Sequence, residues 1–540
     1  MYSGYNMIEN NWWVHLTDAL FNYTLYCDGL SLFFFVLTVF LVTLILFLGP
    51  FSVKFRLREY FFYFVLLQLF ILNFFFISNL FYFYIYFESV LMPMFLIILI
   101  WGSRKRKIHA SFIFFFFTFI GSLFMLLGIC WFILNINNIN ILYLRDYLHV
   151  FSVSELFLWF LFFVAFAVKV PIFPFHTWLP EAHVEAPTGG SIILAGILLK
   201  LGLYGLLRVV FPLLPTGSQV FSPVVWVLSF ISVIYISLII MQNIDLKKII
   251  AYSSIAHMNF AILGLFVFNN YGLQGAIFTL LSHGIISSML FFCIGILYDR
   301  YGERNLLYYT NISQLMPLFS LIFFFAMIGN MGIPGMSSFI GEFLLLLSLS
   351  YKSYLLMFIL SLSLFLTTIY CIWLYNRLSF GFIKIKFIRK FKDLTRLEFL
   401  IGIIFTLSMI IFGLYPRVIL NITSDYTLDL AQFELNKIKY FNLINESYKI
   451  ILESTISTLP KEWQTNPDVI MSAVYYLDEI VHILLAGPDG YDTDKVWIDG
   501  FKSRPDVLSS IKKAWGVVDA QIEEKEALLK IAQEKDGYKK

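Results

Sequence analysis

The sequence predicts an all-α membrane protein that crosses the bilayer about twelve times. Apolar residues make up 59% of the 540 residues and charged residues only 14%, and the mean hydropathy is +0.80. An ordinary soluble domain has about 25% charged residues. Long apolar runs recur over most of the chain, and ionisable side chains lie near the middle of several of them. These observations indicate a polytopic membrane protein.

The spans follow from apolar runs long enough to cross about 30 Å of hydrocarbon. They are predicted at 30–50, 60–79, 80–101, 111–134, 155–178, 187–211, 221–242, 246–267, 272–298, 315–349, 354–376 and 397–415. The predicted organisation is a short N-terminal segment (1–29), a transmembrane domain (30–417), a connector (418–457) and a soluble, mostly helical extension (458–540). The extension is recognised by its many charges of both signs and by helical spacing in QIEEKEALLKIAQEK.

Two of the predicted spans are interrupted. The fifth contains Pro171 and Pro174, and the tenth contains Gly332, Pro334 and Gly335. Proline removes a helical hydrogen bond, which a membrane tolerates where the backbone lines a polar cavity. Broken helices five spans apart are typical of a transporter core built from an inverted repeat. The alternative is two unrelated proline kinks.

Basic residues concentrate in the loops on one side of the predicted bundle. With twelve crossings, that side holds the loops 54–58, 104–107, 247–248, 300–304 and 377–396, whereas the other holds little beyond Arg145, Lys352 and Arg417. The basic loops are expected to face the negative compartment, with both termini on the positive side. Basic loops also bind anionic lipid head groups, and the two roles do not exclude each other.

Six ionisable side chains are the candidate functional residues. They are Glu88, Lys169, Lys200, His257, His283 and Glu342. A charge at the bilayer centre costs roughly 2.5–3.5 kcal/mol, so such residues usually serve a function, and this series suggests a route for protons. A buried histidine can instead bridge two helices. His109, His149, His176 and His183 are expected at the membrane interface, and Glu181 and Glu185 in a loop, where they gate access or cap a helix.

Redox cofactors are not expected in this chain. The four cysteines are widely separated, and no CxxC pair supports an iron–sulfur or zinc site. No glycine-rich fingerprint follows a strand, so a bound nucleotide or flavin is not expected either.

Five motifs, in order along the chain, identify a family resemblance. They are FESVLMPMFLIILIWG (87–102), AFAVKVPIFPFHTWLPEAHVEAPTGGSIILAGILLKLGLYGLLR (165–208), DLKKIIAYSSIAHM (245–258), TLLSHGIISSMLFF (279–292) and GIPGMSSFIGEF (332–343). They resemble the antiporter-like membrane subunits of the proton-pumping NADH:quinone oxidoreductase, respiratory complex I, and subunit 4 above all. The resemblance covers roughly residues 25–417. The wider superfamily includes subunits of cation/proton antiporters and of membrane-bound hydrogenases.

The resemblance assigns roles to the six residues. Glu88 is similar to the glutamate that pairs with a broken-helix lysine, Lys169 matches that lysine, and Lys200 matches the next lysine along the channel. His257 and His283 resemble the histidines of the second half-channel. Glu342 matches the glutamate that stands in subunit 4 where related subunits have a lysine.

The resemblance implies a non-redox, proton-translocating subunit of complex I (a translocase) in the mitochondrial inner membrane. Its basic loops would face the matrix and both termini the intermembrane space. NADH, FMN, iron–sulfur clusters and quinone would be bound by other subunits. The expected partners are neighbouring antiporter-like subunits, other complex I subunits and membrane lipids, cardiolipin among them, and no nucleic acid. The alternatives are a subunit of a cation/proton antiporter and a structural spacer of the membrane arm. The family usually has two helices before the first span here, which are either lost or supplied by another chain.

Overall fold

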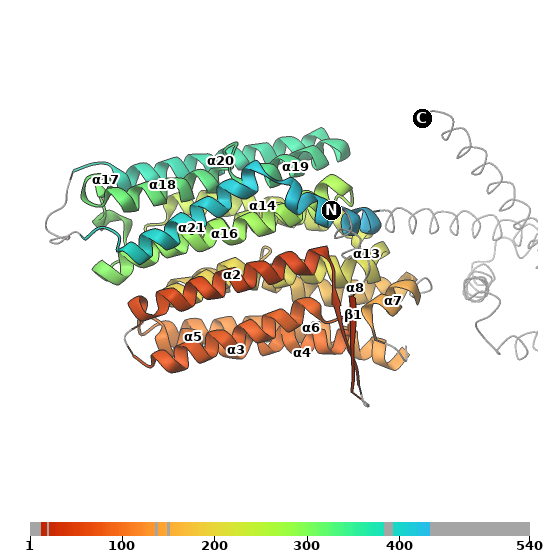
Figure 1. Cartoon of the computed structure of the whole chain (residues 1–540). Coiled ribbons are helices and arrows are strands. Elements are labelled where there is room, and N and C mark those ends of the chain that lie inside the picture. Colours follow the sequence, from red (N-terminus) through yellow and green to blue (C-terminus); the bar gives the residue numbers. More distant parts are fainter. Residues whose placement is uncertain are drawn as a thin grey trace, which may run out of the picture. The chain divides into compact units, whose positions relative to one another are not determined.

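Long apolar helices run roughly parallel to one another through the described part of the chain (Figure 1). The computed structural model describes residues 12–18, 21–53, 55–135, 139–147, 152–382 and 392–431. The predicted extension at 458–540, most of the predicted connector and His149 lie outside these residues.

The elements follow the chain in this order: β1 (Trp12–Asp18), β2 (Phe21–Cys27), α2 (Gly29–Ser52), α3 (Leu57–Phe76), α4 (Leu80–Ser89), α5 (Leu91–Trp101), α6 (Lys107–Asn135), α7 (Ile141–Tyr147), α8 (Ser152–Lys169), α9 (Trp178–Glu185), α10 (Thr188–Ile193), η1 (Leu194–Leu198), α11 (Leu199–Gly205), η2 (Leu206–Val210), α12 (Phe211–Leu213), α13 (Pro215–Val220), α14 (Ser222–Gln242), α15 (Leu246–Leu265), α16 (Asn270–Tyr301), η3 (Leu306–Tyr308), α17 (Ile312–Leu315), α18 (Pro317–Met331), α19 (Ser337–Lys352), α20 (Tyr354–Ser379) and α21 (Arg396–Leu414). The strands form an antiparallel hairpin, and residues 417–431 are also helical.

Ten described helices are long and apolar enough to cross a membrane. Each corresponds to one of the twelve predicted spans, and the two remaining spans are the two broken helices. The predicted fold class, a helical polytopic membrane protein with two broken helices, is therefore confirmed. The small β1–β2 hairpin precedes the first span.

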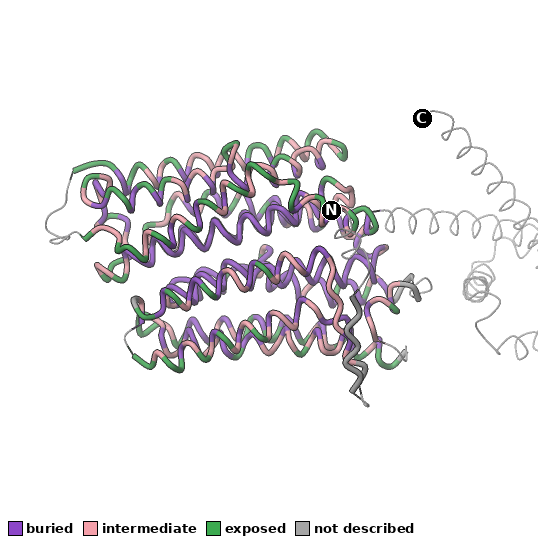
Figure 2. The backbone as a smooth tube through the Cα atoms, viewed as in Figure 1, coloured by how far each residue is buried: buried purple, intermediate pink, exposed green. Residues whose placement is uncertain are grey.

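The core of the bundle consists of two helical segments. α16 is buried without interruption from Gly275 to Leu297, and every residue of the continuous segment Thr188–Leu213 is buried. Figure 2 shows α16 buried along most of its length, with mixed burial on the outer helices. A helix that is apolar all round is buried on all sides, and one with an exposed apolar face meets lipid. The ionisable residues of the central helices are therefore enclosed by protein.

Each broken helix has a local cause in the sequence. α8 ends at Lys169, two residues before Pro171, and α9 begins only at Trp178. α18 ends at Met331, where Gly332 takes a left-handed conformation with φ 72°. Such a backbone is favourable for glycine and strained for other residues, so it terminates the helix there. The breaks at Pro171 and Pro334 lie where the sequence predicts them.

Candidate functional site

The first break holds Lys169 at the end of α8, with its side chain 2% exposed. The Lys169 ammonium lies 4.4 Å from the centre of the Phe87 ring, and Phe87 precedes Glu88 near the end of α4. Trp178 closes the break, because its indole nitrogen donates to the carbonyl of Val168 at 2.9 Å. The carbonyl of Val168, near the end of α8, thus has a hydrogen-bond partner in the first residue of α9.

Glu88 and Lys169 are neighbours without being directly bonded. Lys169 is the charge that acts on the Glu88 carboxylate, and Glu88 is the charge that acts on the Lys169 ammonium. Among the described residues, Lys169 Nζ and Glu88 Oε1 have no hydrogen-bond partner. Unsatisfied buried polar atoms are costly, and a bridging water is the usual way to satisfy them. The arrangement allows either group to change its protonation without first breaking a direct ion pair.

Lys200 is fully buried and makes two hydrogen bonds. Its ammonium donates to the carbonyl of Ala195 at 2.6 Å and lies 2.8 Å from Nδ1 of His283 on α16. Ala195 belongs to η1, a stretch of π-helix. Such bulges frequently mark functional sites, because they alter the regular pattern of backbone hydrogen bonds. Here the bulge offers a backbone acceptor to a buried cation.

From Lys200 and His283, the buried polar groups continue through His257 to Glu342, which follows the second break. The ring centres of His283 and His257 are 5.7 Å apart, and His257 Nδ1 lies 3.7 Å from Glu342 Oε1. Four predicted residues from four segments therefore form one buried series in the order Lys200, His283, His257 and Glu342.

A small cavity lies along this series. Its volume is about 10 Å³, which is about the smallest space that holds one water molecule. Its lining is His257, Thr279, Ser282, His283, Ile286, Gly329, Asn330, Ser338 and Glu342. The polar lining provides the several partners that a buried water needs.

The break at Gly332 leaves room for the Glu342 carboxylate. A Cβ atom at Gly332 would collide with Oε2 of Glu342. Ser338 Oγ donates to the carbonyl of Gly329 across the break. The same backbone turn that ends α18 therefore positions the side chain that ends the series.

The two groups of residues meet through α11. A Cβ atom at Gly202 would lie 3.2 Å from Cβ of Lys169, so the segment that carries Lys200 packs directly against the end of α8. The structure therefore brings all six predicted residues into two adjacent groups. Glu88 and Lys169 form one, and the series from Lys200 to Glu342 forms the other.

His176 and His183, which the sequence predicts at the membrane interface, both lie inside the protein. His176 is 7% exposed and His183 is fully buried, with its ring stacked on Phe291 at 4.5 Å between ring centres. Both ring nitrogens of His183 lack a hydrogen-bond partner in the described structure, and the charges of Lys200 and Lys247 act on the ring. His109 is exposed at the start of α6. Hydropathy could not show that His183 is buried. His183 lies in α9, after the first helix break, and tertiary contacts decide where that segment packs.

Glu181 and Glu185 lie in α9 and not in a loop, which corrects the prediction. Glu185 is buried and lies 3.5 Å from Arg304, whereas the half-buried Glu181 pairs with Lys248 at 2.9 Å. Lys247 is also buried and donates to the carbonyl of Ala186 at 2.8 Å. The end of α9 is thus held to the start of α15 and the segment after α16.

One further polar residue, Asn330, was missed. Asn330 lines the cavity and donates to Sγ of Cys371 at 3.1 Å and to the Tyr370 hydroxyl at 3.4 Å. A lone amide in an apolar span, next to a helix break, is a signal that could have found it. Among the described residues, no group of three His, Cys, Asp or Glu side chains is arranged to hold a metal ion.

Known proteins are similar to this chain in both sequence and fold. Residues 78–369 match the family described as NADH:quinone oxidoreductase/Mrp antiporter, TM. The chain is 47% identical over 401 residues to NADH-ubiquinone oxidoreductase chain 4 of Chondrus crispus, covering 74% of this chain and 81% of that relative. It is 44% identical over 424 residues to NADH-quinone oxidoreductase subunit M of Rickettsia conorii, covering 78% and 85%.

Solved structures of related membrane complexes contain chains with a similar fold. A chain of respiratory complex I from Thermus thermophilus matches with a TM-score of 0.71 and 26% identity, over 79% of this chain and 90% of that one. A chain of the Mrp complex from a Dietzia species has the same TM-score at 17% identity, covering 80% and 91%, which shows the shared fold. This chain belongs to the NADH:quinone oxidoreductase/Mrp antiporter transmembrane family.

Proposed function

We propose that this chain is the proton-translocating subunit 4 of the membrane arm of NADH:ubiquinone oxidoreductase. The observation that carries the proposal is the buried series from Lys200 through His283 and His257 to Glu342, with its cavity. Relatives from algae and bacteria that carry the chain 4 and subunit M names support the choice of subunit. The chain's task is then proton transfer, and quinone reduction by other subunits drives it.

The geometry supports a two-stage transfer. A charged Glu88 favours the protonated form of Lys169, and its neutralisation removes that support. A proton released by Lys169 reaches the second group, where Lys200 and His283 already share a hydrogen bond. Imidazoles relay protons readily because their ordinary pKa is close to neutrality. His257 then passes the proton to Glu342, from which it leaves the membrane.

The orientation is part of the proposal. The basic loops are joined at one end of the bundle: Arg304 donates to Ser103, Arg300 pairs with Glu398, and Trp101 donates to the carbonyl of Phe55. Positively charged loops remain on the negative side of a membrane. We place this end in the mitochondrial matrix, with the transmembrane unit at residues 30–417.

Charge-neutralising variants test the function in vesicles that contain the assembled complex. Glu88→Gln, Lys169→Met and Glu342→Gln should leave NADH oxidation and assembly on a native gel intact, and lower the number of protons pumped per electron. Thr406→Val, a helix-buried polar change outside the two groups, is the control that should pump normally. Normal stoichiometry in all three variants would refute translocation and leave the structural spacer.

The Mrp match favours one second candidate, a cation/proton antiporter. The two are distinguished by where the chain migrates on a native gel stained for NADH dehydrogenase, and by transport without NADH. Co-migration with the active band supports the complex I subunit. Migration in a smaller assembly, with sodium-dependent proton transport in the absence of NADH oxidation, supports the antiporter.

A further inference from the structure

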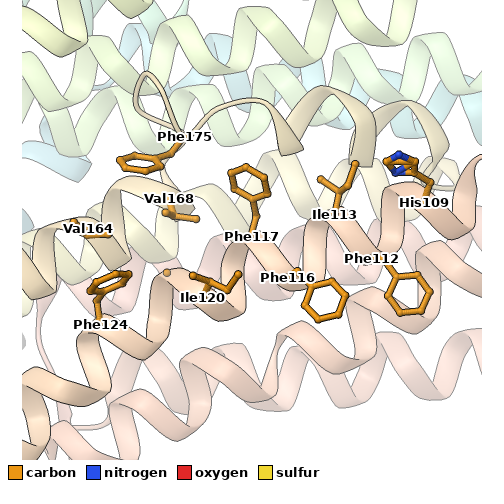
Figure 3. Close-up of a pocket in the computed structure, with 11 residues that line it drawn as sticks. His109, Phe112, Ile113, Phe116, Phe117, Ile120, Phe124, Val164, Val168 and Phe175 are labelled. Atoms are coloured by element: carbon orange, nitrogen blue, oxygen red, sulfur yellow. The ribbon is translucent and has the colours of Figure 1, made fainter.

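An apolar groove lies on the surface of the bundle between α6 and α8 (Figure 3). Its volume is about 670 Å³, within the range of sites that enclose a small ligand. The lining comes from three elements: the α6 face from His109 to Phe124, Val164 and Val168 on α8, and Phe175 in the first helix break. Figure 3 shows the α6 side chains following one another along the helix, with Val164, Val168 and Phe175 facing them. The groove is therefore elongated in the direction of the helices.

The shape of the groove matches an acyl chain. At 1.5 Å per residue, the stretch from His109 to Phe124 is about 22 Å long. One leaflet of hydrocarbon is about 15 Å thick, so the groove is long enough to hold an acyl chain over the full depth of a leaflet. Phe112, Phe116 and Ile120 are 44%, 52% and 55% exposed along this stretch. The floor is close-packed, because a Cβ atom at Gly121 would lie 3.0 Å from Cβ of Val168. An extended hydrocarbon chain fits such a slot, and a compact polar ligand does not.

The entrance of the groove is strongly basic. The loop that leads into α6 reads Arg104, Lys105, Arg106 and Lys107, and the first three side chains are exposed. Among the described residues, none of those three forms an ion pair. Glu185 holds the loop in place by accepting from the backbone N–H of Arg104 at 3.2 Å. Clusters of exposed basic residues at a membrane surface attract anionic lipid head groups.

We propose that this groove binds an anionic diacyl phospholipid. One acyl chain lies along α6 between His109 and Phe124, and the phosphate head group lies on Arg104, Lys105 and Arg106. The charge of the entrance and the length of the slot together select this ligand over a neutral lipid, which lacks the charge, and over a transmembrane helix, which is wider than one acyl chain. Val168 precedes Lys169, so the bound chain also packs against the end of α8 that carries this residue.

Photo-crosslinking tests the proposal on the assembled complex, isolated from its native membrane. The probes are phosphatidylglycerol and phosphatidylcholine, each with a photoreactive diazirine in one acyl chain, and the labelled peptides are mapped by mass spectrometry. Phosphatidylglycerol is expected to label residues 109–124 several-fold more than phosphatidylcholine. Changing Arg104, Lys105 and Arg106 together to Gln should abolish that preference. Changing Arg56 and Arg58 to Gln, in another basic loop, should leave it intact.

Variants that fill the groove provide the second arm. Ile120→Trp at the exposed rim and Val164→Phe at the floor should each reduce labelling by both probes, whereas Val227→Phe on the exposed face of α14 should not. Three results would overturn the proposal: no label within 109–124, as when a neighbouring subunit covers the groove; equal labelling by both lipids; or labelling that the filling variants leave unchanged. Native gels of each variant confirm that the complex has assembled before labelling is compared.

Discussion

A hydrogen bond joins two of the predicted residues, Lys200 and His283, directly. At 2.8 Å, the ammonium and Nδ1 form a direct link, whereas His257 Nδ1 and Glu342 Oε1 are 3.7 Å apart. Both residues are buried, so neither can find a substitute partner in bulk water. We expect them to act as one unit in proton transfer.

Removing either member of this pair should therefore stop the series at the same point. Lys200→Met and His283→Gln are each expected to lower the proton-pumping rate about tenfold or more, as for other losses of a positioned proton-transfer group. Because the two act together, the double variant should pump little worse than either single variant. The measurement is the initial rate of acidification in vesicles at a fixed rate of NADH oxidation. Additive losses would show that the residues work independently.

The glycines of the second break allow a matched comparison at single residues. Gly332 and Gly335 both have positive φ, 72° and 96°, but a Cβ atom would collide with Glu342 at the first and meet no atom within 4 Å at the second. Gly332→Ala should displace the Glu342 side chain and impair pumping. Gly335→Ala should cost about 1–2 kcal/mol of backbone strain and leave pumping intact. Proton-to-electron ratios and thermal inactivation of the complex separate the two effects. Equal pumping in both variants would contradict the role of Gly332.

At the scale of elements, α9 is held in position by contacts with residues far away in the sequence. It is only eight residues long, and its end is held by Glu185 to Arg304 and by Lys247 to the Ala186 carbonyl. A short helix has little stability of its own, so packing and these polar contacts must hold it in place. α9 in turn supplies Trp178, which closes the break beside Lys169.

Its two ion pairs should differ sharply in importance. The Glu185 and Arg304 side chains are 2% and 1% exposed, and removing one partner of a buried pair typically costs about 3–5 kcal/mol. The Glu181–Lys248 pair is shorter, but its side chains are 39% and 30% exposed, where a pair contributes about 0–1 kcal/mol. Glu185→Gln should thus lower the temperature at which the complex dissociates, and Glu181→Gln should barely change it. Native gels after stepwise heating measure both, and similar losses would refute the distinction.

At the scale of the whole molecule, the two ends of the bundle differ in charge, because the basic loops gather at one end. One end carries the contacts among basic loops described above, and at the other end α19 finishes at Lys352 and α20 begins at Tyr354. The proposed direction of pumping depends on which end faces the matrix.

Cysteine labelling can establish this orientation. Lys105→Cys in the basic loop should react with a membrane-impermeant maleimide only from the matrix side, and Tyr354→Cys, at a residue 79% exposed, only from the opposite side. Mitoplasts and inverted vesicles expose the two sides separately, and the unmodified chain measures the background of its four cysteines. The reverse pattern would invert the proposed topology.

Much of this architecture was predictable because it depends on short-range rules. Hydropathy over about twenty residues located the spans, and Pro171 and Gly332 located the breaks, since each changes the backbone at its own position. Glu342 and Lys169 stood out because a charge within an apolar span is costly wherever the helix packs. The sequence did not single out Asn330 and His183 as site residues. An amide and a neutral imidazole carry no charge, and both residues lie near helix breaks, so hydropathy gave them little weight.

The sequence by itself determined the membrane class, the spans, the two breaks and the six ionisable candidates. Only the tertiary structure decided which of them touch: Lys200 meets a histidine 83 positions away, and Glu185 meets an arginine in a distant loop. The physical reason is that the spans are alike in composition, so hydropathy drives each into the membrane without specifying its neighbour. Side-chain shape, close approach at small residues such as Gly202, and the satisfaction of buried polar atoms make that choice. Those terms exist only once the helices have packed.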